Sequence, residues 1–179
     1  GTGLPTWTAQ GDLNLAVYSS HGEFARLVIG VSDVTDCFEL IQHAFNYAEK
    51  YQIPVIVLTE KVIAETDRNV EPFKMGAIPI ERGLVKGADL KKLKNEDRYK
   101  ITEDGLSLRW IPGSSDAYFF SNGDEHAEDG SLMEEAVEAG RMYAKRVRKL
   151  DLVAKNLPEP EVYGEKKNAD ISFIGWGSS

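Results

Sequence analysis

Arg26-Leu27-Val28-Ile29-Gly30-Val31 and Pro54-Val55-Ile56-Val57-Leu58-Thr59 are two short apolar runs separated by a helical pattern. Continuous apolar runs of this length are typical of parallel strands that are covered on both faces. A strand, a helix and a strand in this order predict a βαβ unit with a right-handed crossover. We therefore expect an α/β fold with a mostly parallel sheet flanked by helices.

The helix between the two runs is predicted over Val34–Gln52, with Ser32 or Asp33 as its N-cap. Its apolar residues repeat at helical spacing and its polar residues take the opposite face. The apolar set is Val34, Cys37, Phe38, Ile41, Phe45 and Ala48. A shorter helix is expected over Asp12–Ser19.

The stretch from Lys61 to Pro112 is polar and irregular, and it is predicted to contain a small hairpin-bearing insertion. Two β-rich pieces, Tyr99–Thr102 and Leu106–Ile111, flank the turn residues Glu103-Asp104-Gly105. Short β-rich pieces on either side of a Gly-containing turn favour a hairpin.

A long C-terminal connector helix is predicted to begin at Ser131, because Ser131 and Glu134 form a capping-box pattern. Apolar residues then repeat at helical spacing. They are Leu132, Ala136, Ala139, Tyr143, Val147, Leu150 and Leu157. The basic cluster Lys145-Arg146 and Arg148-Lys149 lies late in this helix, as the helix dipole favours. We interpret that cluster as a solvated or subunit-facing surface.

Charge and cysteine content exclude several kinds of function. The formal net charge of −8 makes nucleic acid and anionic membranes poor partners. No apolar stretch approaches the roughly 18 residues of a membrane helix. The single Cys37 excludes an internal disulfide and favours a reducing, cytoplasmic location. One thiolate is also too few to hold an iron–sulfur cluster.

The first thirteen residues, Gly1 to Leu13, contain three threonines, three glycines and a proline. Gly and Pro interrupt regular structure, so a loop is expected. Its hydroxyl groups could grip a small anion such as a carboxylate. An ordinary polar surface turn is the alternative.

Several ordered blocks resemble the alpha subunit of 2-oxoacid:ferredoxin oxidoreductases of the 2-oxoglutarate type. The blocks are Thr2–Thr6 with Thr8 and Gln10–Leu13; His21–Phe24 with Arg26; Ala44–Asn46 with Ala48–Gln52 and Pro54–Leu58; Asn122-Gly123 with Glu125-His126 and Glu128–Gly130; and Lys145-Arg146 with Arg148–Leu150. Gly1, Trp7, Ala9 and Ala25 depart from the family pattern. Because Trp7 and Ala9 lie in the implied substrate loop, the choice of oxoacid stays open.

The resemblance implies the later half of a thiamine pyrophosphate pyrimidine-binding domain. Residues 1–157 would be this half-domain with its connector, 158–168 a linker and 169–179 the first strand of a following domain. We accordingly expect a central fragment of a longer subunit. A trimmed expression form of a complete domain is the alternative.

The resemblance also implies site residues. Thr2 and Thr6 would bind the 2-oxoacid, next to an arginine upstream of Gly1, and Gly3, Gln10 and His21 would lie in the active-site vicinity. No catalytic residue is assigned to this chain, because the family's cofactor-activating glutamate lies in the first half of the domain. His126 with Glu125, Glu128 and Asp129 is a metal constellation by composition alone; a solvated turn or a partner contact is favoured over metal.

The implied reaction is oxidative decarboxylation of a 2-oxoacid to an acyl-CoA, with electrons passed to ferredoxin. Thiamine pyrophosphate with Mg²⁺ would be held mostly by the first half of the domain and by the beta subunit. The iron–sulfur cluster and CoA would belong to the full complex rather than to this chain, which should be inactive alone. A non-catalytic α/β module that docks partner subunits, and a thiamine enzyme of the transketolase or pyruvate-decarboxylase kind, are the alternatives.

Overall fold

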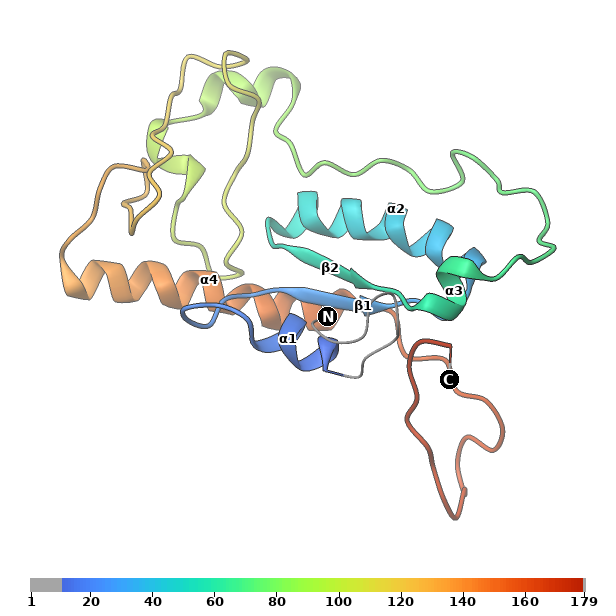
Figure 1. Cartoon of the computed structure of the whole chain (residues 1–179). Helices are drawn as coiled ribbons and strands as arrows, with labels where there is room; N and C mark the ends of the chain where they lie inside the picture. The colour runs from blue at the N-terminus through green and yellow to red at the C-terminus, as the bar shows by residue number, and fades with distance from the viewer. Residues whose placement is uncertain (1–10, 179) are drawn as a thin grey trace.

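The computed structural model describes residues 11–178 and contains a βαβ unit and a final helix (Figure 1). Between them lies a long segment with little regular structure, residues 66–135, which we call the excursion. The elements are α1 (Asp12–Tyr18), β1 (Leu27–Gly30), α2 (Val34–Tyr51), β2 (Val55–Leu58), α3 (Lys61–Glu65), the 3₁₀ helices η1 (Gly87–Lys92) and η2 (Asn95–Arg98), and α4 (Ala136–Asn156). No described helix is long and apolar enough to cross a membrane.

The two strands pair in parallel, with Leu27 opposite Val55 and Gly30 opposite Leu58. Helix α2 lies on one side of the pair, and α1 and α4 lie on the other (Figure 1). The predicted βαβ unit is therefore confirmed. Each strand and the helix between them begin and end within one residue of their predicted positions. Within residues 11–178 the sheet has only these two strands.

Helix α2 begins and ends where local chemistry dictates. The Asp33 carboxylate accepts hydrogen bonds from the backbone N–H groups of Thr35 and Asp36, at 2.8 and 2.9 Å. These bonds satisfy donors that the first helical turn leaves without partners. The helix ends at Gln52, which adopts the left-handed conformation with φ of 53°. Asp33 is thus the N-cap of the two candidates.

The main buried cluster lies where the end of α2 meets α4. Ala25, Tyr51, Ile53 and Val153 are each less than 7% exposed and pack together. Leu27, Tyr47, Leu106, Leu152 and Leu157 lie against them. The excursion between α3 and α4 is therefore anchored to the βαβ unit through Leu106 and α4.

Gln52 connects three parts of the chain around this cluster. Its side-chain amide donates to the Ser107 carbonyl at 2.7 Å, and its side-chain oxygen accepts from Arg98 at 3.1 Å. Its backbone carbonyl accepts from the Lys149 ammonium at 2.9 Å. The end of α2, the segment 98–107 and α4 are therefore held by one residue.

The predicted hairpin is not formed. Tyr99–Thr102 and Leu106–Ile111 contain no strand, and the contacts between them come from side chains. The Thr102 hydroxyl donates to the Leu106 carbonyl and the Ser107 hydroxyl to the Lys100 carbonyl, both at 2.8 Å. Backbone groups of the two pieces bond elsewhere instead. Tyr99 N–H donates to the Glu128 carbonyl and Ile101 N–H to the Glu128 carboxylate, while the Arg109 carbonyl accepts from Val85 N–H.

The N-cap predicted for α4 is wrong by four residues. Glu135 is the N-cap, and its carboxylate accepts from the Glu138 N–H at 3.0 Å. Ser131 does not cap the helix, because its N–H and hydroxyl both donate to Asp129. Leu132 therefore precedes the helix and is 56% exposed.

The buried side of α4 also differs from the predicted apolar face. Met142, Lys145, Lys149 and Val153 are buried, whereas Tyr143 and Leu150 are 42% and 43% exposed. Of the four basic residues in the cluster, Lys145 and Lys149 are buried, and Arg146 and Arg148 are partly exposed. Arg146 pairs with Glu125, and Arg148 donates to the Thr102 carbonyl at 2.9 Å. The interpretation of the cluster as a solvated or subunit-facing surface was therefore wrong for Lys145 and Lys149.

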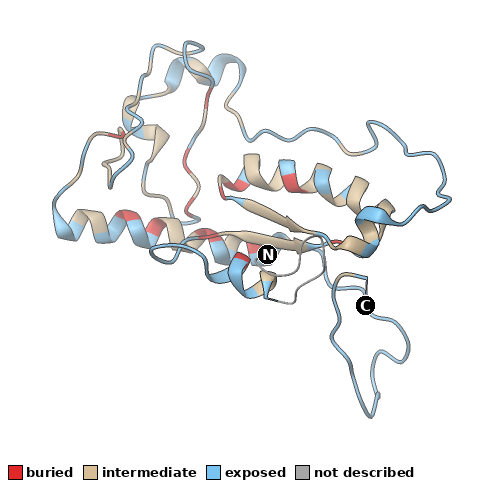
Figure 2. Ribbon diagram, viewed as in Figure 1, coloured by how far each residue is buried: buried red, intermediate tan, exposed pale blue. Residues whose placement is uncertain are grey.

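The segment Ala169–Trp176 does not form the predicted strand. Its apolar residues are exposed, with Phe173 at 93% and Ile174 fully exposed. The segment is coloured as exposed along its length (Figure 2), although Trp176 at its end lies beside Gly30 of β1. Because no described strand lies beside it, its backbone lacks the hydrogen-bond partners that a sheet provides.

Gly105 generates a stability prediction. Its φ is +81°, and a Cβ there would lie 2.6 Å from the Lys145 carbonyl oxygen. We expect Gly105→Ala to lower the free energy of unfolding by about 2–4 kcal/mol, through backbone strain and displacement of α4. Urea denaturation followed by circular dichroism measures this change.

Gly123→Ala is the matched control, because no atom lies within 4 Å of a Cβ built at that position. It should change the free energy of unfolding by less than about 0.5 kcal/mol. Equal effects of the two substitutions would contradict the close approach of residue 105 to α4.

Candidate functional site

Most of the predicted site residues cannot be placed. Thr2, Gly3, Thr6 and Gln10 lie outside the described residues, as does Ser179. His21 is described and lies on the exposed turn that joins α1 to β1. This turn is the described part of the predicted site.

Arg26 organises the turn that carries His21. Its guanidinium donates to the carbonyls of Ser19 and Ala16, at 2.7 and 3.3 Å, and to the Ser20 hydroxyl at 3.2 Å. It also lies over the Phe24 ring, 4.1 Å from the ring centroid. These bonds satisfy carbonyls at the C-terminal end of α1, which a helix leaves without partners. Arg26 therefore fixes α1, whose other end continues from the predicted substrate loop.

The carboxyl ends of the two strands form a second part of the site region, because ligands of open α/β sheets bind there. Val31, directly after β1, is 1% exposed. Glu60, which follows β2, accepts from the Ser178 N–H at 2.8 Å. The Ser178 hydroxyl and N–H lower the pKa of Glu60 through these hydrogen bonds. The residues 175–178 therefore lie at the edge where a ligand would be expected.

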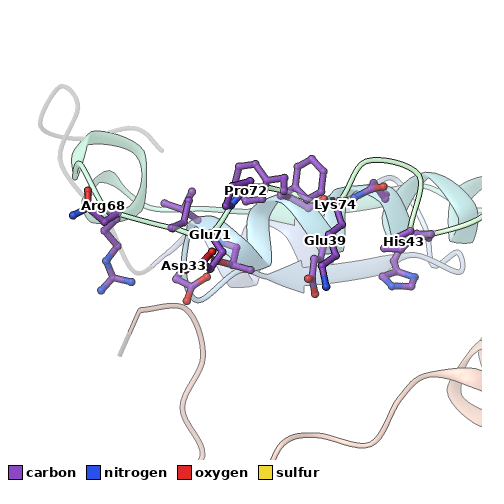
Figure 3. Close-up of a pocket in the computed structure, with 16 residues that line it drawn as sticks. Asp33, Glu39, His43, Arg68, Glu71, Pro72 and Lys74 are labelled. Carbon is purple, nitrogen blue, oxygen red and sulfur yellow. Dashed lines mark hydrogen bonds between the residues drawn. The ribbon is translucent and has the colours of Figure 1, made fainter.

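A broad groove of about 800 Å³ runs between α2 and residues 68–78 (Figure 3). The Phe38 and Phe73 rings stack at 4.3 Å between centroids and hold the two walls together. Charges of both signs line it, including Glu39, Arg68 and Lys74, as the close-up shows. The Asp33 carboxylate at one end is committed to the N-terminus of α2. A mixed, open groove of this kind suits a polar contact surface better than a desolvated catalytic pocket.

The acidic loop around His126 is a structural unit. Glu125 pairs with Arg146, and Glu128 accepts from Ile101 N–H at 2.6 Å. The Asp129 carboxylate accepts from Ser131, and these bonds lower its pKa. The His126 ring lies 4.2 Å from the Tyr99 ring. In the part of the chain that the structure describes, no group of His, Cys, Asp or Glu side chains is arranged to hold a metal ion.

Two buried lysines were missed by sequence reasoning. Lys145 is 4% exposed, and its ammonium donates to the Ser107 hydroxyl at 2.5 Å and to the Tyr99 carbonyl at 3.3 Å. Lys149 is 9% exposed and bonds to the Gln52 carbonyl. Burial, followed by the charges of Lys149 and Arg98, lowers the pKa of Lys145 to about 7. Burial, followed by Arg98, lowers the pKa of Lys149 to about 8.

The lysine partners explain why these residues are tolerated inside. A buried cation is costly unless its donors find acceptors, and both ammonium groups bond to oxygen atoms here. The spacing of four residues places both on one helix face. That spacing was the available sequence signal, but a basic pair on a helix usually predicts an outward face.

The described fold is that of an α/β chain built on one parallel strand pair, with its longest helix docked through both polar contacts and the buried apolar cluster. Residues 1–145 match the family described as pyruvate flavodoxin/ferredoxin oxidoreductase, thiamine diphosphate-binding. The chain therefore belongs to this family.

Similar proteins agree with this membership. The chain is 38% identical to subunit alpha of 2-oxoacid:ferredoxin oxidoreductase 1 from Sulfurisphaera tokodaii, over 99% of its own length and 28% of the relative. It is 31% identical to 2-oxoglutarate oxidoreductase subunit KorA from Mycobacterium tuberculosis, over 99% of this chain and 27% of that subunit. The resemblance to 2-oxoacid:ferredoxin oxidoreductase alpha subunits is thereby confirmed, and the chain spans less than a third of the length of these relatives.

A solved structure gives the same result in three dimensions. It is 2-oxoglutarate:ferredoxin oxidoreductase from Magnetococcus marinus with 2-oxoglutarate, coenzyme A and succinyl-CoA bound. The TM-score is 0.79 at 34% sequence identity, with 95% of this chain and 29% of that chain covered. The fold is therefore the one found in part of that oxidoreductase.

The donor atoms of this chain limit which cofactors it could hold. An iron–sulfur cluster needs several thiolate ligands, and Cys37 is the single cysteine. Burial, followed by the Asp33 and Asp36 carboxylates, raises the pKa of the Cys37 thiol, which further disfavours the thiolate. The residues of this chain therefore do not fit a cluster by themselves.

The buried lysines generate a pH prediction. Because the pKa of Lys145 is about 7 in the folded chain and 10.5 ordinarily, the unfolded state binds more protons between these values. Stability should therefore rise with pH from about 7 towards 10. Lys145→Met should reduce this slope by at most about 1.4 kcal/mol per pH unit, the value for one proton. Urea midpoints across the range measure it.

Lys155→Met, an exposed lysine on the same helix, is the control and should leave the slope as it is. If Lys145→Met and Lys155→Met showed the same slope as the unaltered chain, the buried amine would not be the titrating group.

Proposed function

We propose that this chain is part of a thiamine-dependent 2-oxoacid:ferredoxin oxidoreductase. The reaction would be oxidative decarboxylation of a 2-oxoacid, with 2-oxoglutarate favoured, to the acyl-CoA, and ferredoxin would accept the electrons. The observation that carries this proposal is the structural likeness to the Magnetococcus marinus enzyme at a TM-score of 0.79. The family match over residues 1–145 supports it independently.

Two findings support 2-oxoglutarate as the substrate. The Magnetococcus marinus structure contains 2-oxoglutarate, and the Mycobacterium tuberculosis relative is named a 2-oxoglutarate oxidoreductase subunit. The relatives at 38% identity are named for 2-oxoacids generally. Trp7 and Ala9 in the substrate loop are the positions at which this chain could differ in side-chain selectivity.

Within that reaction, Thr2 and Thr6 would orient the substrate carboxylate by hydroxyl hydrogen bonds. Gly3 would let the backbone approach the substrate, and Gln10 and His21 would lie nearby. Arg26 would act indirectly, by holding the end of α1 and the turn that carries His21. Thiamine pyrophosphate, when bound with Mg²⁺, supplies carbanion stabilisation.

The proposed partners would supply the cofactor and cluster ligands that residues 1–179 lack. A beta subunit would complete the cofactor site and would carry the iron–sulfur cluster, since one cysteine cannot ligate it. CoA would bind in the assembled complex. Residues 1–157, 158–168 and 169–179 are proposed as the half-domain with its connector, the linker and the beginning of the following domain.

Thr6→Ala tests the substrate site in the full complex. A hydroxyl bonded to a carboxylate contributes about 1.5–3 kcal/mol, so we expect kcat/KM for 2-oxoglutarate to fall by roughly 10- to 100-fold. The measurement is 2-oxoglutarate-dependent reduction of an electron-accepting dye, with thiamine pyrophosphate, Mg²⁺ and CoA present.

Thr66→Ala, an exposed threonine after α3, is the matched control and should keep full activity. Full activity of Thr6→Ala would remove Thr6 from the site without touching the family assignment. A complex that turned over no 2-oxoacid of a panel would instead overturn the proposed reaction.

The isolated chain provides a second test. We expect no oxoacid-dependent dye reduction by residues 1–179 alone, even with added cofactors, because this chain lacks the ligands for a cluster. Adding the beta subunit to the full alpha subunit in the same assay is the positive control. Robust turnover by the isolated chain would show that it holds a complete active site.

A further inference from the structure

The chain returns to the βαβ unit after α4. Helix α4 ends at Asn156, and residues 158–175 are exposed throughout. Residues 176–178 then contact the carboxyl ends of β1 and β2. We call these three residues the docking segment. A linker leaves the units on either side of it free to move, so a return of this kind calls for a different explanation.

Trp176 lies where Gly30 has no side chain. A Cβ built at Gly30 would lie 3.0 Å from Cε3 of the Trp176 ring and 3.8 Å from the Gly177 nitrogen. The ring therefore lies over the backbone of the last residue of β1, in space that a larger side chain would fill. Trp176 is 50% exposed, so about half of its surface is covered. Covering an indole removes apolar area from water, which stabilises the contact.

Gly177 turns the chain towards Glu60. Its φ of +72° lies in the left-handed region, which glycine adopts without steric cost. A Cβ there would lie 3.3 Å from Glu60 Oε1, so the turn passes close to the carboxylate. The Ser178 N–H donates to the same oxygen at 2.8 Å, and the Ser178 hydroxyl also bonds to this carboxylate. Two donors of one residue therefore meet one carboxylate that lies 118 residues away in the sequence.

Glu60 is available for this contact because its own helix does not use it. Glu60 is the N-cap of α3, yet its side chain makes no capping hydrogen bond. A capping carboxylate normally accepts from an N–H of the first helical turn, as Asp33 does for α2. The carboxylate of Glu60 bonds to the docking segment instead.

Little space remains beside the docking segment. Ser178 lines a cavity of about 50 Å³, whose walls include Ser32, Asp33 and Arg68. Pockets that bind small molecules measure roughly 300–1,000 Å³. The docking segment itself is therefore the occupant of this part of the carboxyl edge.

We propose that the docking segment fastens residues 158–175 as a closed loop, with Gly30 and Glu60 as its binding site on the βαβ unit. The other end of this loop is held by α4, whose Val153 packs with Ala25 and Ile53. Ala25 and Ile53 precede β1 and β2, whereas Gly30 and Glu60 end or follow them. The predicted linker is thus fixed at both ends of the strand pair and cannot swing as a free tether.

Quenching of tryptophan fluorescence by acrylamide tests this contact in the chain of residues 1–179. Trp7→Phe leaves Trp110, which is 2% exposed, and Trp176 as the tryptophans. In this background we expect Gly30→Leu to raise the quenching constant roughly twofold, because the covered half of the Trp176 ring becomes accessible. Gly22→Leu is the matched control and should leave the constant unchanged, since a Cβ there would meet no atom within 4 Å.

Glu60→Ala tests the second contact of the docking segment. It removes the acceptor of the Ser178 N–H, so the quenching constant should rise towards that of Gly30→Leu. Combining Gly30→Leu with Glu60→Ala should add nothing further, because both substitutions release the same segment. Glu65→Ala is the control, since the Glu65 carboxylate pairs with Lys61 within α3.

Circular dichroism verifies that each variant stays folded, and Trp176→Phe identifies the part of the signal that belongs to Trp176. Equal quenching of the Gly30→Leu variant and its Trp7→Phe parent would overturn the docked position of Trp176. Additive effects of Gly30→Leu and Glu60→Ala, or no response to Glu60→Ala, would overturn the assignment of both residues to one binding site.

Discussion

The hydrogen bonds of Gln52 are the constraint on which the arrangement of the chain depends. The left-handed backbone at this residue ends α2 and turns its carbonyl towards Lys149, while its side chain holds Arg98 and Ser107. Without these bonds the excursion 66–135 would meet the βαβ unit through few buried apolar contacts. The bond from Lys149 to Gln52 therefore acts together with the buried cluster of Tyr51, Ile53 and Val153 in setting the position of α4.

The βαβ unit could be predicted from the sequence because its signals are local. Apolar runs define β1 and β2, and the Asp33 cap lies two and three residues from the donors that it satisfies. The hairpin and the start of α4 were wrong because distant partners decided them. Glu128 takes the backbone donors that a hairpin would need, and Asp129 takes Ser131 away from its capping role. Such competition between partners is not visible in a propensity or a periodicity.

Less of the candidate site than of the βαβ unit could be predicted from the sequence. The resemblance identified the threonine loop and His21, yet Thr2, Gly3, Thr6 and Gln10 lie outside the described residues. The buried Lys145 and Lys149 could not be identified, since charge predicts exposure unless oxygen partners are known in advance. Because these two lysines were expected to be exposed, the sequence predicted the wrong buried face of α4 and a solvated basic cluster.

The contacts at Gln52 also have a consequence for the order of folding. They close loops of 46, 55 and 97 residues, to Arg98, Ser107 and Lys149 respectively. Long loops cost more chain entropy to close than the short segment that joins β1 to β2. The βαβ unit should thus form early, and α4 should dock late, when its two lysines lose their water. Until that step a nascent chain would expose both sides of α4, so chaperones would meet this helix before its lysine side is covered.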